Sequence, residues 1–292
     1  MTRSVLLVPA AVLGLAGCAG LIGASFDDAH LQPDASAPKD AQPPSPDGSQ
    51  DAGLIDPMAI PGLFAWFSAD FGITVQDGGG GLARWASHVP GQYADPLTPD
   101  LAPGFVANVQ HEQPAVSFVA SKTQLLKVNG KGLGGKEASL FVVGRGSTHA
   151  ALNFRLDANS TPFILFPYDI HVGAGGAGIT AGLFISGEEL AQLPIRPKDW
   201  GIWEVRYEAG ATSGIEAFLN GVSTDKVTPL LGGLPDNLDM YLGGVPPPTS
   251  GLPLFYDGDL GEVLVYRAAL DDSTRRNVEV YLSLRWDIPL GK

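Results

Sequence analysis

The sequence predicts an all-β fold: a sandwich of two antiparallel sheets with one short helix at its C-terminal end. Glycine and proline are abundant, at 38 and 24 of 292 residues, and charged residues make up only 17%, which is typical of a turn-rich extracellular β domain. Short apolar and aromatic runs recur between turn signals. No segment before residue 270 keeps a helical period for more than about two turns.

The expected strands are short. They are Leu63–Phe67, Leu82–Ala86, Pro114–Phe118, Gln124–Leu126, Ser139–Gly144, Phe163–Phe166, Leu183–Ile185, Trp203–Tyr207, Ile215–Leu219 and Leu260–Tyr266. The run Ser139–Gly144 is continuously apolar, as expected for a strand that is buried on both faces. Asn220-Gly221 predicts a tight hairpin, because this pair readily adopts the positive φ angles of a type I′ turn.

Around Trp203, apolar and charged residues alternate. The period of two places Glu204, Arg206 and Glu208 on one face of the strand. We expect this to be a solvated face on a half-buried strand.

One helix is expected at the end of the chain. Asp271 or Asp272 can cap it by accepting hydrogen bonds from free backbone N–H groups. Four apolar residues then recur at helical spacing and predict one buried face: Val278, Tyr281, Leu282 and Trp286. Pro289 ends this pattern.

The chain begins with a basic residue, an apolar run from Val5 to Leu15, and the box Leu15-Ala16-Gly17-Cys18. This pattern describes a secretory signal peptide. Ending in that box, it resembles a bacterial lipoprotein signal, which implies cleavage after residue 17 and a lipid on Cys18. An uncleaved membrane anchor from Val5 to Gly23 is one alternative, since a spanning helix needs about 20 apolar residues. A buried Cys18 thiol is another.

By the same resemblance, Ala19 after the cysteine suggests export to the outer membrane or cell surface. Residues 18–57 would then form a tether rich in Pro, Ala, Asp and Ser, which lacks the apolar surface needed to fold. The folded domain is expected at residues 58–292.

The net charge of −13 argues against nucleic acid as a partner, because such binding needs a basic face. It also argues against electrostatic adhesion to anionic lipid, so that membrane attachment depends on the lipid on Cys18. With one cysteine in the chain, thiolate-based zinc and iron–sulfur sites are excluded.

The C-terminal segment carries a family resemblance. It comprises Tyr256–Tyr266, Ala269–Asp271 and Val278–Leu282, followed by Trp286. Together with the preceding strands, it resembles the laminin-G-like, concanavalin A-like domains of exported bacterial proteins. That resemblance covers roughly residues 60–290 and implies a jelly-roll topology. Where relatives carry an acidic loop after the second tryptophan, this chain has Ser87–Gly91.

Catalysis is not expected. Glycan hydrolases of this class carry a Glu-x-Asp-x-x-Glu strand, with one carboxylate to attack and one to protonate. Here Arg206 stands in the centre of the nearest segment. The expected function is a lipoprotein that displays a domain for binding a glycan or a surface protein. A structural envelope module without a small ligand and a degenerate glycoside hydrolase are the alternatives.

Two candidate sites follow from residue type. Asp70, Asp257 and Asp259 could supply the hard oxygen ligands that calcium prefers, although a polar turn before a strand is the simpler explanation. Trp200 lies beside an expected turn and is the aromatic most suited to stack on a ligand. Trp66, Trp85 and Trp286 are expected in the core.

Overall fold

The computed structural model describes residues 55–78, 80–130, 137–148, 150–155, 169–175, 178–185, 188–189, 199–208, 214–227, 239–244 and 255–291. All of them belong to one compact unit, Asp51–Lys292. Cys18, most of the expected tether and the expected strand Phe163–Phe166 lie outside the described residues. Among the helices in these ranges, none has the length and apolar character needed to cross a membrane.

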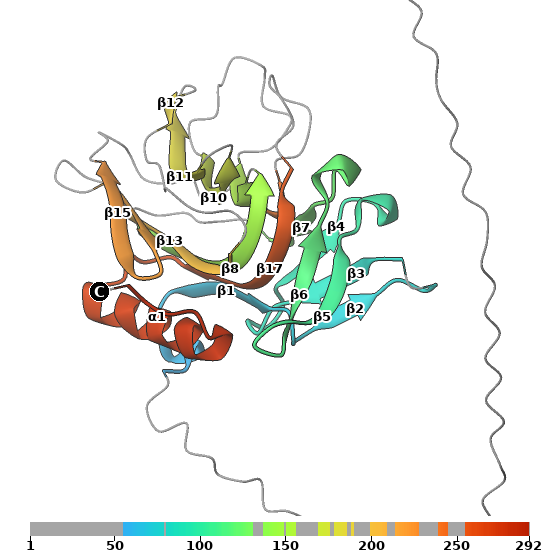
Figure 1. The fold of residues 1–292 in the computed structure, drawn as a ribbon, viewed down its shortest axis with the longest axis horizontal. Coiled ribbons are helices and arrows are strands. Elements are labelled where there is room, and N and C mark those ends of the chain that lie inside the picture. The colour runs from blue at the N-terminus through green and yellow to red at the C-terminus, as the bar shows by residue number, and fades with distance from the viewer. Residues whose placement is uncertain are drawn as a thin grey trace, which may run out of the picture. The chain divides into compact units, whose positions relative to one another are not determined.

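The described residues form two antiparallel sheets (Figure 1). The first sheet has eight strands: β15 (Val222–Val227), β14 (Ile215–Leu219), β13 (Gly201–Glu208), β8 (Glu137–Thr148), β17 (Asp257–Tyr266), β6 (Gln113–Phe118), β5 (Gly104–Gln110) and, paired with β17, β1 (Leu63–Ser68).

The second sheet has nine strands within the described ranges. In order they are β12 (Glu188–Glu189), β11 (Gly178–Ile185), β10 (Asp169–Gly175), β9 (Ala150–Arg155), β16 (Asp239–Leu242), β7 (Leu126–Val128), β4 (Tyr93–Pro96), β3 (Leu82–Ala86) and β2 (Ile73–Val75). Three short 3₁₀ helices, η1 (Pro57–Ala59), η2 (Pro99–Leu101) and η3 (Ala120–Lys122), and the C-terminal helix α1 (Asp272–Trp286) complete the fold. The predicted jelly-roll sandwich with one C-terminal helix is confirmed.

The two largest hydrophobic layers lie between the sheets and under α1, and a smaller cluster is formed by Leu125, Tyr241 and Phe255. Strand β8 contributes to both layers, because Leu140 and Val142 face the layer between the sheets, whereas Phe141 and Val143 face the layer under α1. This explains the uninterrupted apolar run in β8, since each of its faces is covered (Figure 1).

Strand β17 is the centre of the first sheet. One edge pairs with β8. The other edge pairs first with β6 and then with β1. The register shifts between Leu260 and Glu262, and the glycine between them is required by close packing. A Cβ atom on Gly261 would lie 2.1 Å from the Trp286 ring.

Helix α1 begins as predicted. The Asp271 side chain caps it by accepting a hydrogen bond from the Thr274 N–H at 2.8 Å. The helix ends at Trp286 because Asp287 adopts a left-handed conformation with φ of 50°, so it stops before Pro289 is reached. Val278, Tyr281, Leu282 and Trp286 are buried, as expected.

The prediction of a solvated face on β13 is wrong. Glu204 is only 1% exposed, because α1 covers this face and places Arg275 at 3.4 Å from its carboxylate. Arg206 binds Glu216 and Asp272, each at 2.7 Å, instead of the two glutamates of its own strand. Burial, and then the nearby carboxylate of Glu279, raise the pKa of Glu204 well above its usual value.

The β14–β15 hairpin yields a test of local packing. Asn220 and Gly221 both have positive φ, at 48° and 80°, which confirms the predicted turn. A Cβ atom on Gly221 would also lie 2.2 Å from an Arg276 nitrogen and 2.9 Å from a Glu279 oxygen. Gly221→Ala should therefore cost more than the ~1–2 kcal/mol of left-handed strain alone.

Gly91→Ala is the matched control. Gly91 also has φ of 80°, but its Cβ position has no atom within 4 Å. Thermal unfolding should rank the melting temperatures as wild type, then the Gly91 variant, then the Gly221 variant. Equal losses in the two variants would show that the Arg276 and Glu279 contacts are unimportant.

The raised pKa of Glu204 predicts a pH dependence of stability. The folded chain holds the Glu204 proton at pH values where the unfolded chain has lost it. The contribution of Glu204 to the free energy of unfolding is therefore complete below its unfolded pKa and falls as pH rises through its folded pKa. Glu204→Gln preserves the neutral form. This variant should melt above the wild type at about pH 9, by a few degrees, and the advantage should vanish near about pH 5.

Glu208→Gln is the control, because Glu208 lies on the same strand but is exposed. A difference in melting temperature between wild type and the Glu204 variant that stays constant across this pH range would contradict the assignment of a buried neutral carboxyl.

Candidate functional site

The outer face of the second sheet carries a row of polar side chains. On β7, Leu126 and Val128 point into the layer between the sheets, and the period of two turns Lys127 to the other side. On β16, Met240 and Leu242 face the same layer, so that Asp239 and Tyr241 lie on the other face of the strand, where both are buried and Tyr241 packs with Leu125 and Phe255. Three strands thereby present polar groups together, because β4 pairs with β7 and β7 with β16.

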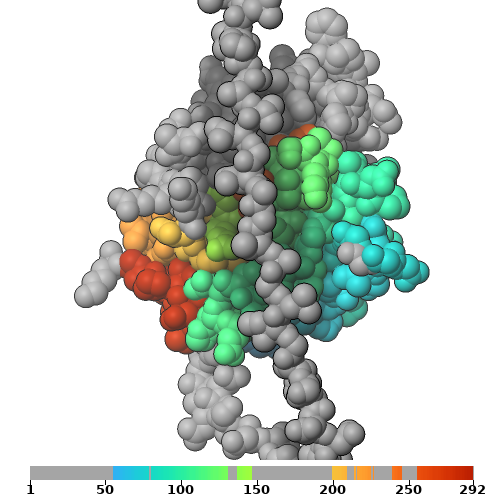
Figure 2. Space-filling view, turned by 45° about the vertical axis from the view of Figure 1, so that its right-hand side comes forward, coloured from blue at the N-terminus to red at the C-terminus, as the bar shows by residue number. Residues whose placement is uncertain are grey.

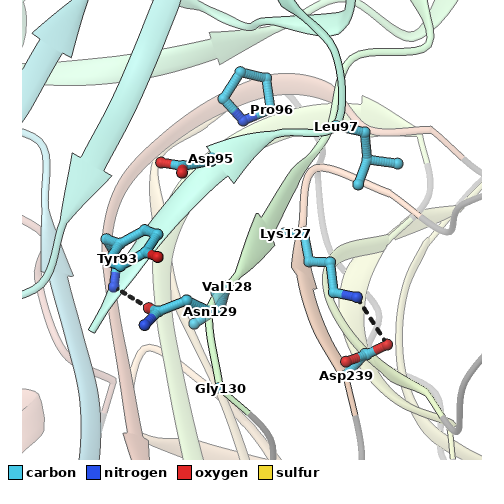
Figure 3. Close-up of a pocket in the computed structure, with 9 residues that line it drawn as sticks. All are labelled: Tyr93, Asp95, Pro96, Leu97, Lys127, Val128, Asn129, Gly130 and Asp239. Atoms are coloured by element: carbon cyan, nitrogen blue, oxygen red, sulfur yellow. Dashed lines mark hydrogen bonds and ion pairs between the residues drawn. The ribbon is translucent and has the colours of Figure 1, made fainter. Parts of the chain in front are cut away.

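These strands line a cleft with a volume of about 370 Å³ (Figure 3). Its lining residues are Tyr93, Asp95, Pro96, Leu97, Lys127, Val128, Asn129, Gly130 and Asp239. In the space-filling view, the cyan residues that include β2 and β3 lie at the right, and the red residues of α1 lie at the lower left (Figure 2). Helix α1 packs against the first sheet, whereas the cleft is lined by strands of the second sheet.

Lys127 and Asp239 form the deeper charged pair of the cleft (Figure 3). The ammonium group lies 3.0 Å from the Asp239 carboxylate, whose side chain is only 3% exposed. Burial alone would lower the pKa of Lys127, but the hydrogen bond to Asp239 and the nearby Tyr241 outweigh burial and raise the pKa. Lys127 therefore stays cationic and keeps 40% of its side chain exposed, where a ligand can reach it.

A second charged pair borders the cleft. Arg84 on β3 donates two hydrogen bonds to Asp95, at 2.8 and 2.7 Å, and its guanidinium lies 3.8 Å from the centre of the Tyr93 ring. The hydrogen bonds to Asp95 raise the pKa of Arg84. The geometry orients both the aromatic ring and the carboxylate.

Asn129 fixes the wall of the cleft. Its Oδ1 accepts a hydrogen bond from the Tyr93 N–H (Figure 3), and its Nδ2 donates to the Gly91 carbonyl at 2.8 Å. These bonds use the side-chain amide to hold the end of β7 against β4. Asn129 therefore positions Tyr93, and the groups left to contact a ligand are the ring, the charged pairs and the exposed Leu97.

The three aspartates proposed as calcium ligands are not brought together. Asp70 binds Arg285 at 2.6 Å beside α1, and Asp259 binds Arg145 at 2.8 Å. Asp257 accepts a hydrogen bond from the Ala120 N–H at 3.2 Å. In the described part of the chain, no group of three or more His, Cys, Asp or Glu side chains is placed to hold a metal ion.

Trp200 does not line the cleft. Its ring stacks on Trp286, with centroids 5.3 Å apart, and the Arg145 guanidinium lies 5.4 Å from its centre. It packs partly buried in the layer under α1. Trp66, Trp85 and Trp286 are buried in the core, as predicted.

Sequence reasoning missed the residues of the cleft. The available signals were the alternation Leu126-Lys127-Val128 and the position of Asp95 next to the buried residue Ala94. Both are short, and neither shows which strands become neighbours.

No family model and no curated protein matches the chain. Among solved structures, a Trypanosoma rangeli sialidase bound to sialic acid is 13% identical, with a TM-score of 0.47 over 80% of this chain. The match covers 34% of the sialidase, so the chain spans about a third of that protein.

Two smaller domains also match. Domain 4 of AbnA, a GH43 extracellular arabinanase from Geobacillus stearothermophilus, in complex with arabinotriose, is 14% identical with a TM-score of 0.39, over 72% of this chain and 95% of that one. The CBM40 of a Ruminococcus gnavus sialidase, bound to α2,3-sialyllactose, is 14% identical with a TM-score of 0.41, over 50% and 84%. The sandwich fold of the present chain rests on its own strand pairing.

Proposed function

We propose that the protein is a non-catalytic glycan-binding module, held at the outer membrane or cell surface by a lipid on Cys18. The cleft on the outer face of the second sheet carries this proposal. Its volume of about 370 Å³ lies in the range of small-ligand sites, about 300–1,000 Å³. It offers an aromatic ring, Tyr93, next to fixed hydrogen-bonding groups, a combination that suits the apolar faces and hydroxyl edge of a sugar ring.

The charges of the cleft favour a neutral glycan. Lys127 is paired with Asp239 and Arg84 with Asp95, so each cation has an anion beside it. The chain as a whole carries a net charge of −13, which disfavours polyanionic ligands. A neutral sugar can bond to both members of a charged pair without bringing an uncompensated charge into the cleft.

The lipid on Cys18 is the second part of the proposal. The net charge of −13 disfavours electrostatic adhesion of the protein to anionic lipid. The lipid on Cys18 would supply the membrane affinity, since each buried CH₂ contributes about 0.8 kcal/mol.

Glycan binding can be tested with the full chain carrying Cys18→Ala, screened on a glycan array with calcium and with chelator. We expect binding to neutral glycans that persists in chelator. Tyr93→Leu should weaken binding about tenfold or more, because aromatic anchors dominate binding energy, and Leu97→Ala should weaken it several-fold.

Leu284→Ala is the matched control for Leu97→Ala, since both leucines are exposed, at 60% and 43%, and only Leu97 lines the cleft. An array without any binding would refute the proposal and favour a protein partner or a structural role. Binding that is abolished by chelator would indicate a calcium site. Cleavage of a bound glycan would support the hydrolase alternative.

The lipid anchor has a separate test. Wild-type protein expressed in a bacterium with two membranes should fractionate with the membranes and incorporate labelled fatty acid. Cys18→Ala should remove the label and release the protein, because the acidic domain has no electrostatic attraction to anionic lipid. Cys18→Ala protein that stays with the membranes would contradict the anchor and favour an uncleaved spanning segment.

A further inference from the structure

Three aromatic rings stack in a column, which we call the ring column: Trp66, His88 and Phe71. The centroids of Trp66 and His88 are 3.9 Å apart with an interplanar angle of 22°. Those of His88 and Phe71 are 4.0 Å apart with an angle of 18°. Trp66 is 9% exposed and Phe71 is 43% exposed, so the column runs from the buried layer under α1 to the surface and ends in an exposed ring.

The ring column is fixed by hydrogen bonds at each level. The Trp66 indole N–H donates to Glu262 at 2.7 Å. His88 donates its backbone N–H to the Trp66 carbonyl at 2.8 Å, and its Nε2 lies 2.7 Å from the Ser68 hydroxyl oxygen. The Phe71 N–H donates to the Ser68 carbonyl at 3.0 Å. A ring held in this way loses little freedom when a ligand stacks on it.

Asp70, which precedes Phe71 in the chain, belongs to a partly exposed charged pair. Asp70, whose side chain is 42% exposed, binds Arg285, which is 25% exposed, at 2.6 Å. Burial alone would raise the pKa of Asp70, but its hydrogen bonds with Ser68 and Arg285 and the charge of Arg285 lower it. A carboxylate and a guanidinium can accept and donate further hydrogen bonds beyond the one they share.

The cluster is arranged for binding and not for nucleophilic attack. Ser68 and His88 are in hydrogen-bond contact, but Ser68 is fully buried, so no substrate can reach its hydroxyl group. Asp70 bonds to Ser68 and Arg285 and does not orient the imidazole of His88 as a catalytic triad would require.

We propose that Phe71, Asp70 and Arg285 form a second sugar subsite, in which one pyranose ring stacks on Phe71 and its hydroxyl groups bond to Asp70 and Arg285. This inference rests on the proposed function but uses none of the residues of the cleft. A single exposed ring beside one charged pair matches a monosaccharide in size. It is far smaller than the ~800 Å² that each partner buries in a stable protein–protein interface.

The test uses the full chain with Cys18→Ala and the cleft substitutions Tyr93→Leu and Leu97→Ala, so that signals from the cleft are removed. Saturation-transfer difference NMR is recorded with the methyl α- and β-pyranosides of glucose, galactose and mannose. We expect transfer from aromatic protein protons to the C–H protons of at least one of these sugars. Adding Phe71→Ala should abolish this transfer, and Phe71→Tyr, which keeps the ring, should preserve it.

Val75→Ala in the same background is the control, because Val75 is 53% exposed on the nearby strand β2 and should leave transfer unchanged. Asp70→Asn keeps the shape of the side chain and should weaken binding several-fold. No transfer in the cleft-substituted background, or transfer that survives Phe71→Ala, would overturn the second subsite. The proposed function is judged separately, by the array with the cleft intact.

Discussion

The buried carboxylate of Glu262 is the interaction on which the rest of the structure depends. It accepts hydrogen bonds from the indole N–H groups of Trp66 and Trp286, at 2.7 and 2.8 Å, and from the Tyr281 hydroxyl at 2.9 Å. Arg285 lies 3.0 Å away. Burial raises the pKa of Glu262, while Arg285 and the hydrogen bonds oppose this rise. Since these donors come from β1 and α1 and the carboxylate from β17, one side chain joins the first strand, the last strand and the helix.

Both candidate sites follow from this junction. By holding α1 against the first sheet, it covers the apolar side chains that β8, β13 and β17 present on that face. Helix α1 packs on the first sheet, and polar side chains on the outer face of the second sheet line the cleft. The same carboxylate fixes Trp66, on which His88 and then Phe71 stack. A buried hydrogen-bond network can in this way set the orientation of a ring at the surface, because each level of the stack is held by the one below it.

The sequence predicted the elements whose cause is local. Asn220-Gly221 carries its own turn preference, and Asp271 caps a helix from its first turn, so both could be recognised in place. Glu204 could not, because the helix that buries it begins at Asp272 and reaches β13 only in the folded chain. The cleft could not be predicted from the sequence for the same reason. Lys127 and Asp239 are 112 positions apart, and nothing in either segment shows that β7 and β16 pair. Asp70 and Asp259 show the same limit, because the sequence does not reveal that Arg285 and Arg145 lie beside them.

Paired charges are common to the two proposed sites. In the cleft, Lys127 and Arg84 each face a carboxylate, and beside the ring column Arg285 faces Asp70. Unpaired charge elsewhere on the surface is screened over roughly 8–10 Å at physiological ionic strength. A sugar at either proposed site would therefore meet mainly local dipoles and aromatic surface.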